Sequence, residues 1–249
     1  MEVAIVTVGD ELLAGETENT NATWLARQLT DRGATIPRMV TVPDDRTVIA
    51  RWVREFRDAF DAVVVTGGLG DTHDDVTLEA VADALDRELT VQPSVREAVV
   101  EKARQYREEN PERYERHDFE FDPDETAALP GGARPLQTAA SFNPGCVVAN
   151  VYVFPGFPDE LRVMFEEVAG EFGGDVVSET VETATPEGAL KDVLEGVRDR
   201  FDVAVGSYPA RRGEPGRVKL TGTDPEAVGR AVEWVDERVA DPDPDPDPD

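Results

Sequence analysis

Residues 62–77 have the sequence AVVVTGGLGDTHDDVT, and this stretch decides the predicted fold. Its first five residues form a continuous apolar run, which is typical of a strand buried on both faces of a sheet. A glycine-rich loop follows the strand, and a helix is predicted from about Thr77 to Asp86. The stretch is therefore a strand, a loop and a helix, the repeating unit of α/β proteins.

The residues before this stretch repeat the same order of elements. Val3–Val8 and Thr35–Val42 are predicted strands, and Asn19–Arg32 is a predicted helix between them. Asp44 or Asp45 can cap a second amphipathic helix before the strand at residue 62. The alternation predicts an α/β fold with a doubly wound, mostly parallel sheet and helices on both faces.

The rest of the chain suggests a second, smaller α/β domain. Gly173-Gly174 is a natural boundary, so we expect a first domain over 1–173 and a β-α-β-β-α domain over 174–240. Residues 241–249 alternate Asp and Pro, and proline and like charges both disfavour packed structure. We therefore expect a disordered tail.

The middle of the first domain is less regular in sequence. Residues 94–114 predict a charged helix, and 147–154 predict a strand or a hairpin. The acidic segment 117–124 is expected to be mobile. His73 and His117 are the only histidines, and solvated loop positions explain them better than a shared zinc ion.

The charge of the chain is strongly negative. It has 53 acidic and 25 basic side chains, for a formal net charge of −28, and only three of the basic residues are lysines. Such a surface repels nucleic acid, because nucleic-acid binding depends on basic patches that neutralise phosphates. Acidic excess with few lysines favours a halophilic protein, because molar salt screens the repulsion; an ordinary acidic protein is the alternative.

Hydrophobic patterning and cysteine content favour a cytoplasmic protein. No apolar run approaches the roughly 20 residues that a membrane span needs, so no membrane partner is expected. The N-terminus has the pattern of a strand and not of a signal peptide. Cys146 is the only cysteine, which excludes an internal disulfide and a multi-cysteine metal site.

The loop after residue 66 has the composition of a ligand site. Gly67, Gly68 and Gly70 allow the backbone to approach a ligand closely, and the next helix adds its positive N-terminal end. The carboxylates at 71, 74 and 75 are expected to be buried, and they would suit a divalent cation that bridges them to a phosphate. The alternative is that Asp75 is only the N-cap of the helix.

Two further acidic loops are expected at the same sheet edge, because ligands of such sheets bind beyond the carboxyl ends of the strands. Gly9–Gly15 follows the first strand and carries Asp10 and Glu11, and Pro43-Asp44-Asp45 follows the second. We therefore predict a metal site, Mg²⁺ or another divalent cation, with Asp10, Asp74 and Asp75 as ligands. Solvated carboxylates are the alternative for the first loop, and a helix cap for the second.

Several motifs in order resemble the molybdopterin-binding-domain superfamily, and within it the N-terminal domain of competence/damage-inducible protein A. The matching segments are Gly9-Asp10-Glu11-Leu12-Leu13-x-Gly15, Asn21, the loop from Thr66 to Thr77, Leu129-Pro130-x-Gly132-Ala133, Pro144-Gly145 and Phe154-Pro155-Gly156-x-Pro158-x-Glu160. They cover about the first two thirds of the chain, and their combination is specific where each alone is weak.

The resemblance implies a molybdopterin or nucleotide ligand, a divalent cation and a homo-oligomer. Two aspartates that assist adenylylation of molybdopterin in such enzymes match Asp44 and Asp75 best, which makes these the candidate catalytic residues. Related domains are instead credited with hydrolysing ADP-ribose or FAD-type dinucleotides, and a non-catalytic binding module is a third possibility. The candidate ligand-binding residues are Gly9, Asp10, Glu11, Gly15, Thr66, Gly67, Gly68, Gly70, Thr72, Thr77, Pro155 and Gly156.

The chain also departs from the family pattern. Thr138 and Ser141 stand where the competence-protein pattern has Asn and Gly, and Asp71 stands where it usually has proline. The substrate pocket is therefore expected to differ. The amidase domain of full-length relatives is not among these 249 residues, so we expect no such activity from them.

Overall fold

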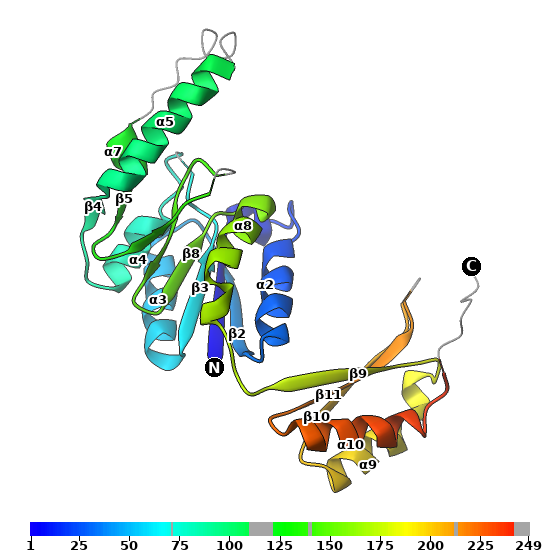
Figure 1. Cartoon of the computed structure of the whole chain (residues 1–249). Coiled ribbons are helices and arrows are strands. Elements are labelled where there is room, and N and C mark those ends of the chain that lie inside the picture. The colour runs from blue at the N-terminus through cyan, green and yellow to red at the C-terminus, as the bar shows by residue number, and fades with distance from the viewer. Residues whose placement is uncertain (71, 110–121, 139–140, 212–213, 242–249) are drawn as a thin grey trace. The chain divides into compact units, whose positions relative to one another are not determined.

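The computed structural model forms two compact units (Figure 1). The first unit comprises residues 1–29 and 36–172, and the second comprises 30–35 and 173–249. The described residues are 1–70, 72–109, 122–138, 141–211 and 214–241. Asp71, His117, most of the segment expected to be mobile and all but the first residue of the Asp-Pro tail lie outside them.

A six-stranded sheet is the centre of the first unit. Its strand order is β2-β1-β3-β8-β7-β6. The strands are β1 (Glu2–Val8), β2 (Thr35–Val42), β3 (Ala62–Thr66), β6 (Arg134–Leu136), β7 (Gly145–Val148) and β8 (Val151–Phe154). β3 is parallel to β1 and to β8, whereas β7 is antiparallel to β6 and β8. The predicted α/β class with a mostly parallel sheet is confirmed, and 147–154 belongs to the β7–β8 hairpin.

Helices cover both faces of this sheet (Figure 1). On one face lie α3 (Arg46–Ala59) and α4 (Thr77–Ala84), whose buried side chains share one core with β1, β3 and β8. On the other face lie α2 (Thr20–Asp31) and α8 (Pro158–Val168). Their Trp24 and Phe165 rings meet edge to face at 5.2 Å.

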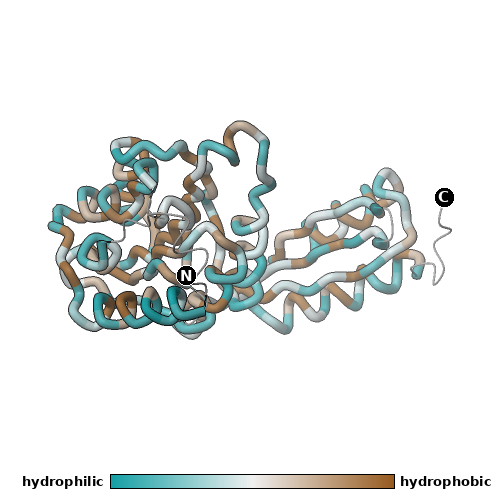
Figure 2. Tube along the Cα trace, turned by 90° about the horizontal axis from the view of Figure 1, so that it is seen from above, coloured by the Kyte–Doolittle hydropathy of each residue, from teal (hydrophilic) through white to brown (hydrophobic). Residues whose placement is uncertain are grey.

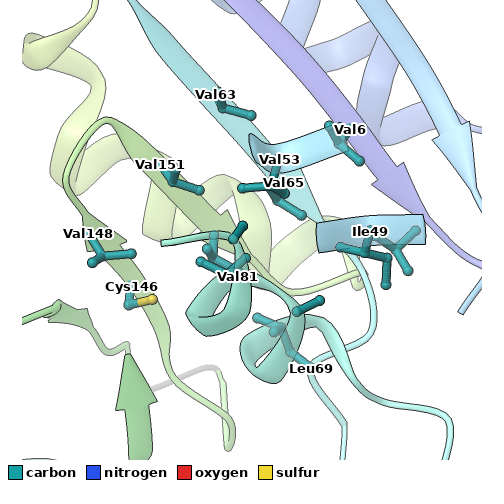
Figure 3. Packing of buried hydrophobic residues seen from close by; sticks show 14 of the residues in the cluster. Val6, Ile49, Val53, Val63, Val65, Leu69, Val81, Cys146, Val148 and Val151 are labelled. Atoms are coloured by element: carbon teal, nitrogen blue, oxygen red, sulfur yellow. The ribbon is translucent and has the colours of Figure 1, made fainter. Parts of the chain in front are cut away.

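The alternation of side chains along the strands produces these two cores. Val6 of β1 and Val63 and Val65 of β3 point to the α3 side and pack against Ile49 and Val53 (Figure 3). The intervening strand residues face α2 and α8 and are also buried. Both faces of the central strands are therefore apolar, which is why their sequences are continuous hydrophobic runs.

The described part of the first unit also contains a long charged helix, a 3₁₀ turn (Ala169–Glu171) after α8 and four smaller elements. The helix α5 (Pro93–Glu109) buries Val95 and Val99. The smaller elements are α1 (Asp10–Leu13), α7 (Pro123–Thr126), β4 (Leu89–Val91) and β5 (Ala128–Pro130). β4 and β5 pair in an antiparallel ribbon. The loop expected after β1 thus contains one short helix, and the Leu129-Pro130-x-Gly132-Ala133 segment begins in strand β5.

The second unit is a three-stranded antiparallel sheet with two α-helices. Its strands lie in the order β10-β11-β9, and Val181, Leu190, Val218, Leu220 and Val228 lie in its core. Hydrophobic and hydrophilic residues alternate along its helices (Figure 2). The elements are β9 (Val177–Thr183), a 3₁₀ turn (Glu187–Ala189), α9 (Lys191–Arg200), β10 (Ala204–Tyr208), β11 (Gly216–Gly222) and α10 (Pro225–Asp236). None of the helices in the described part of the whole chain has the length and hydropathy needed to span a membrane.

Candidate functional site

Loops that follow the parallel strands are tied together at one edge of the sheet. The amide of Gly9, after β1, donates to the carbonyl of Val42 at 3.1 Å, the last residue of β2. The hydroxyl of Thr66, the last residue of β3, donates to the carbonyl of Pro155 at 2.8 Å, just after β8. These bonds bring together the loops that the sequence placed at the carboxyl ends of the strands.

The glycine loop after β3 is held in a conformation that side chains disfavour. Gly67 and Gly68 have φ of 104° and 65°, in the left-handed region. A Cβ on Gly67 would lie 2.2 Å from the carbonyl oxygen of Val8. The buried Thr77 at the start of α4 secures the loop, because its hydroxyl donates to Gly67 O at 2.9 Å and its amide to Gly68 O at 3.2 Å.

The carboxylate of Asp75 closes the far end of this loop. Its Oδ2 accepts from the Thr72 amide at 3.0 Å and lies 2.5 Å from the Thr72 hydroxyl, whose one hydrogen is shared with Asp74 Oδ1 at the same distance. Helix α4 has Val76 as its N-cap and no side-chain capping bond, so the alternative that Asp75 is only a cap is wrong. The expectation of buried carboxylates is also corrected, because Asp74 is exposed and Asp75 is half-buried.

Asp44 approaches the site from the loop after β2. Its Oδ2 accepts from the Asp10 amide at 2.8 Å, and its Oδ1 lies 3.5 Å from the position a Cβ would take on Gly68. Its neighbour Asp45 is the cap of α3, accepting from the Val48 amide at 2.9 Å. Partial burial raises the pKa of Asp44, and the charges of Asp10, Glu11 and Asp74 raise it further against the Asp10 hydrogen bond.

These acidic residues match the chemistry of a hard divalent cation without forming a ready-made site. The described residues contain no group of three or more His, Cys, Asp or Glu side chains arranged to hold a metal, so the predicted set Asp10, Asp74 and Asp75 is not preassembled. Burial is the main cause of the raised pKa of Asp44, and a cation would relieve the carboxylate repulsion that adds to it. Mg²⁺ commonly uses one or two carboxylates and completes its shell with water and substrate phosphates.

A larger pocket of about 350 Å³ lies against the glycine loop. Its volume is in the range of small-molecule sites, about 300–1,000 Å³. One side of the pocket is formed by the glycine loop and α4, and the other side is formed by segments that lie later in the chain. The loop side and α4 contribute Gly68, Leu69, Gly70, Thr72, His73, Asp75, Leu78 and Glu79, and the other side contributes Leu89, Glu125, Thr126, Ala128, Asn143 and Pro144.

A smaller pocket of about 100 Å³ is lined in part by Gly67 and by residues after β1. Among the predicted ligand-binding residues, Glu11, Thr66, Gly67 and Gly156 line it. Gly9 and Pro155 belong to the loops at this edge of the sheet through the backbone hydrogen-bonding groups described above. Gly15, which has a left-handed conformation after α1, lines neither pocket.

The far wall of the larger pocket was missed by reasoning from sequence. Only Pro144 carried a signal, as part of the Pro144-Gly145 segment that resembles the family pattern. Leu89, Glu125 and Ala128 lie in or beside β4, α7 and β5, short elements that meet only through tertiary pairing. Nothing in their local pattern indicates a binding site.

Three consecutive backbone amides of this loop have no acceptor within the described part of the protein. Within the described residues, no protein group accepts a hydrogen bond from the amides of Gly68, Leu69 and Gly70, which line the larger pocket. Consecutive free amides beside a helix N-terminus form a site for an anion. The site as a whole combines a glycine-rich loop with nearby carboxylates at the edge of an α/β sheet.

Comparison with known proteins identifies the family. Residues 4–172 match the probable molybdopterin binding domain, and the chain belongs to this family. Residues 175–242 match the middle domain of FAD synthase. The predicted resemblance is thereby confirmed.

Relatives and a solved structure agree with this family. The chain is 36% identical to a protein of Archaeoglobus fulgidus over 97% of this chain and 99% of the relative. It is 35% identical to a CinA-like protein of Citrifermentans bemidjiense over 79% of this chain, which is 48% of that protein. The crystal structure of CinA, of unknown function, from Thermoplasma acidophilum covers 69% of this chain at 28% identity, with a TM-score of 0.58 and 97% of its own length.

Proposed function

We propose that this protein binds a phosphorylated pterin or nucleotide in the larger pocket and supports nucleotidyl transfer that depends on a divalent cation. The observation that carries this proposal is the row of free amides at Gly68, Leu69 and Gly70. Phosphate oxygens are suitable acceptors for such amides, and the N-terminus of α4 favours the same negative charge. Membership of the molybdopterin-binding family supports a pterin ligand.

The carboxylates around the glycine loop give the protein's side of the proposed chemistry. Asp44 and Asp75 both lie against this loop, one near Gly68 and one near Gly70. The pocket lining contains no Lys or Arg among the described residues, so a phosphate there needs another source of positive charge. A divalent cation would supply that charge and polarise the phosphate; Asp10, Asp44, Asp74 and Asp75 are the residues that could hold it.

Hydrolysis of a dinucleotide pyrophosphate bond is the second candidate function. The match of residues 175–242 to the middle domain of FAD synthase favours it, because that match associates the chain with dinucleotide chemistry. The same amides and carboxylates would serve a pyrophosphate as well as a single phosphate.

One substrate panel tests both functions. Purified protein is incubated with ATP plus molybdopterin, with ADP-ribose and with FAD, each with Mg²⁺, Mn²⁺ or Co²⁺, and products are separated by chromatography. Adenylylated pterin supports transfer, and AMP from a dinucleotide supports hydrolysis. Binding measured by calorimetry without turnover would mean a non-catalytic module. Absence of both binding and turnover would contradict the proposal.

The homo-oligomer implied by the resemblance is a separate prediction, tested by sedimentation.

A further inference from the structure

The far wall of the larger pocket includes a segment without regular secondary structure. Residues 141–144, here called the wall segment, precede β7, and Asn143 and Pro144 line the pocket. The side-chain Oδ1 of Asn143 is buried and has no hydrogen-bond partner among the described residues. The position of this wall therefore depends on other contacts of the segment.

Lys102 of α5 makes one of these contacts. It follows Val95 and Val99 on the buried side of the helix, so its ammonium group reaches inward while α5 is otherwise mostly exposed. Its Nζ donates to the carbonyl oxygens of Thr138 at 2.5 Å and Ser141 at 2.6 Å. Burial lowers the pKa of Lys102, and the charge of Glu160 opposes that effect.

Ser141 connects the same segment to α8. Its hydroxyl lies 2.6 Å from the carbonyl oxygen of Asn143 and 3.0 Å from Oε2 of Glu160, and its one hydrogen serves these two acceptors. Its amide donates to the Thr138 hydroxyl at 3.2 Å. Thr138 and Ser141 are both buried.

The choice of lysine at position 102 supports a specific role. Only three of the 25 basic residues are lysines, and the other two, Lys191 and Lys219, lie in the second unit. A compact ammonium group donates to two carbonyls at once in a narrow space, whereas a planar guanidinium needs a wider arrangement of acceptors. Position 102 therefore has a geometric reason to keep lysine in an arginine-rich chain.

We propose that Lys102, Ser141 and Glu160 are positioning residues, which hold the wall segment in the conformation that lets the larger pocket bind its ligand. The inference rests on the proposed function for the identity of the ligand. Lys102 holds the segment from α5, Glu160 holds it from α8, and Ser141 joins the two to the backbone of Asn143. None of the three lines the pocket, so they act on the ligand only through the wall.

The test compares K102M with K191M. Met keeps the apolar stem of lysine up to the ε position but removes the ammonium group with its donors. Lys191 is an exposed lysine of the second unit whose side chain is 77% accessible. Hydrogen exchange without ligand measures protection of the amides of residues 141–148, and calorimetry with ADP-ribose and Mg²⁺ measures binding. We expect K102M to exchange at least about tenfold faster there and to bind at least about tenfold more weakly, because hydrogen bonds from a charged donor are among the strong ones.

Three further variants separate positioning from general destabilisation. E160Q keeps an acceptor for Ser141 and should retain most of the protection, whereas E160A should lose it. K102R should restore folding stability more fully than it restores binding. K191M should match the wild type in every measurement.

The outcomes are distinguishable from failure of the proposed function. If K102M keeps wild-type exchange at residues 141–148, or loses that protection while binding ADP-ribose as the wild type does, the positioning role is wrong. If the wild type itself binds neither ADP-ribose nor the other ligands of the panel, the proposed function fails. The exchange pattern of K102M would then still decide whether Lys102 holds the wall segment.

Discussion

Asp44, Asp45 and Asp75 are three aspartates of this edge of the sheet with different surroundings. Asp45 satisfies an amide in the first turn of α3 and acts as a helix cap. Asp44 instead accepts from the loop after β1, and Asp75 accepts from Thr72 inside the glycine loop. A cap requires only an acceptor, whereas cation binding requires a negative charge. Substitution by Asn separates these roles, because Asn keeps an acceptor and removes the charge.

Asp75→Asn is expected to reduce activity without unfolding the protein. The new Oδ1 still accepts from Thr72, so the free energy of unfolding should change by no more than about 1 kcal/mol. Loss of the charge should lower turnover of whichever substrate the panel identifies by about a hundredfold, or roughly 2.7 kcal/mol of barrier. Thermal melting and steady-state kinetics measure the two effects. Asp45→Asn is the matched control and should change neither, because Asn caps a helix as well as Asp. Full activity in Asp75→Asn would reject the catalytic assignment.

Asp44→Asn is expected to stabilise the protein at neutral pH in the absence of a cation. The pKa of Asp44 is raised above its ordinary 3.8, chiefly by burial, so the folded state holds this proton more tightly than the unfolded chain. Stability from this group therefore falls as the pH rises from the ordinary to the raised pKa, and the loss persists at neutral pH. The gain in Asp44→Asn should stay below about 1 kcal/mol, because the side chain is partly solvated.

Denaturant titrations of Asp44→Asn and the wild type over a range of pH measure the difference in their free energies of unfolding. It should vanish below the ordinary pKa, where the wild-type carboxyl is uncharged in both states. Asp45→Asn again serves as control. An Asp44→Asn protein less stable than the wild type at neutral pH would show that its charge is stabilised by interactions other than those described.

At the residue scale, the sequence predicted the types of residue at the site better than their contacts. The glycine loop and its acidic residues were identifiable because their composition is unusual after a buried strand. Cap and site carboxylates could not be separated, since Asp suits both and each stands just before or after a helix start. Residues such as Glu125 and Ala128 were beyond prediction, because their place in the pocket depends on the pairing of β4 with β5.

At the scale of elements, the junction of β3 with α4 depends on close contact between backbones. Gly67→Ala should therefore destabilise the fold by about 2 kcal/mol or more, because it strains a left-handed residue and places a methyl group against Val8 O. Gly170→Ala is the control, since a Cβ there meets nothing within 4 Å. Chemical denaturation of the two variants gives the comparison. Equal stability of both variants would contradict the described loop geometry.

The predicted elements agree best where one physical signal dominates. The strand predicted over Thr35–Val42 has the same bounds in the structure, and the central strands were recognisable from continuous apolar runs. The hairpin of β7 and β8 was left open, because an apolar run with a turn inside it also fits one long strand. Its turn contains Ala149 at a φ of 52°, in the left-handed region, and an alanine in the sequence does not predict that conformation.

At the scale of the whole molecule, the net charge of −28 is the dominant property. The ion pairs seen in the described residues are mostly between exposed side chains, for example Arg46–Asp83 and Arg104–Glu101. Such pairs contribute little individually, and they cannot balance 53 acidic residues with 25 basic ones. Repulsion among unpaired carboxylates therefore opposes folding at low salt.

Stability is accordingly expected to rise with KCl concentration, as in a halophilic protein. The screening length is about 10 Å at 0.1 M salt and about 3 Å at 1 M, so most of the repulsion between surface carboxylates should be removed over that interval. Melting temperature measured from 0.05 to 3 M KCl should rise steeply at first and level off near 1 M.

Salts that are excluded from the protein surface also stabilise folded proteins, so the shape of the curve matters more than its sign. Choline chloride at matched ionic strength tests screening without specific potassium binding, and sucrose tests exclusion without screening. Screening predicts equal effects of the two chlorides and a small effect of sucrose. A melting temperature that stays constant or falls in KCl would reject the halophilic interpretation and leave an ordinary acidic protein.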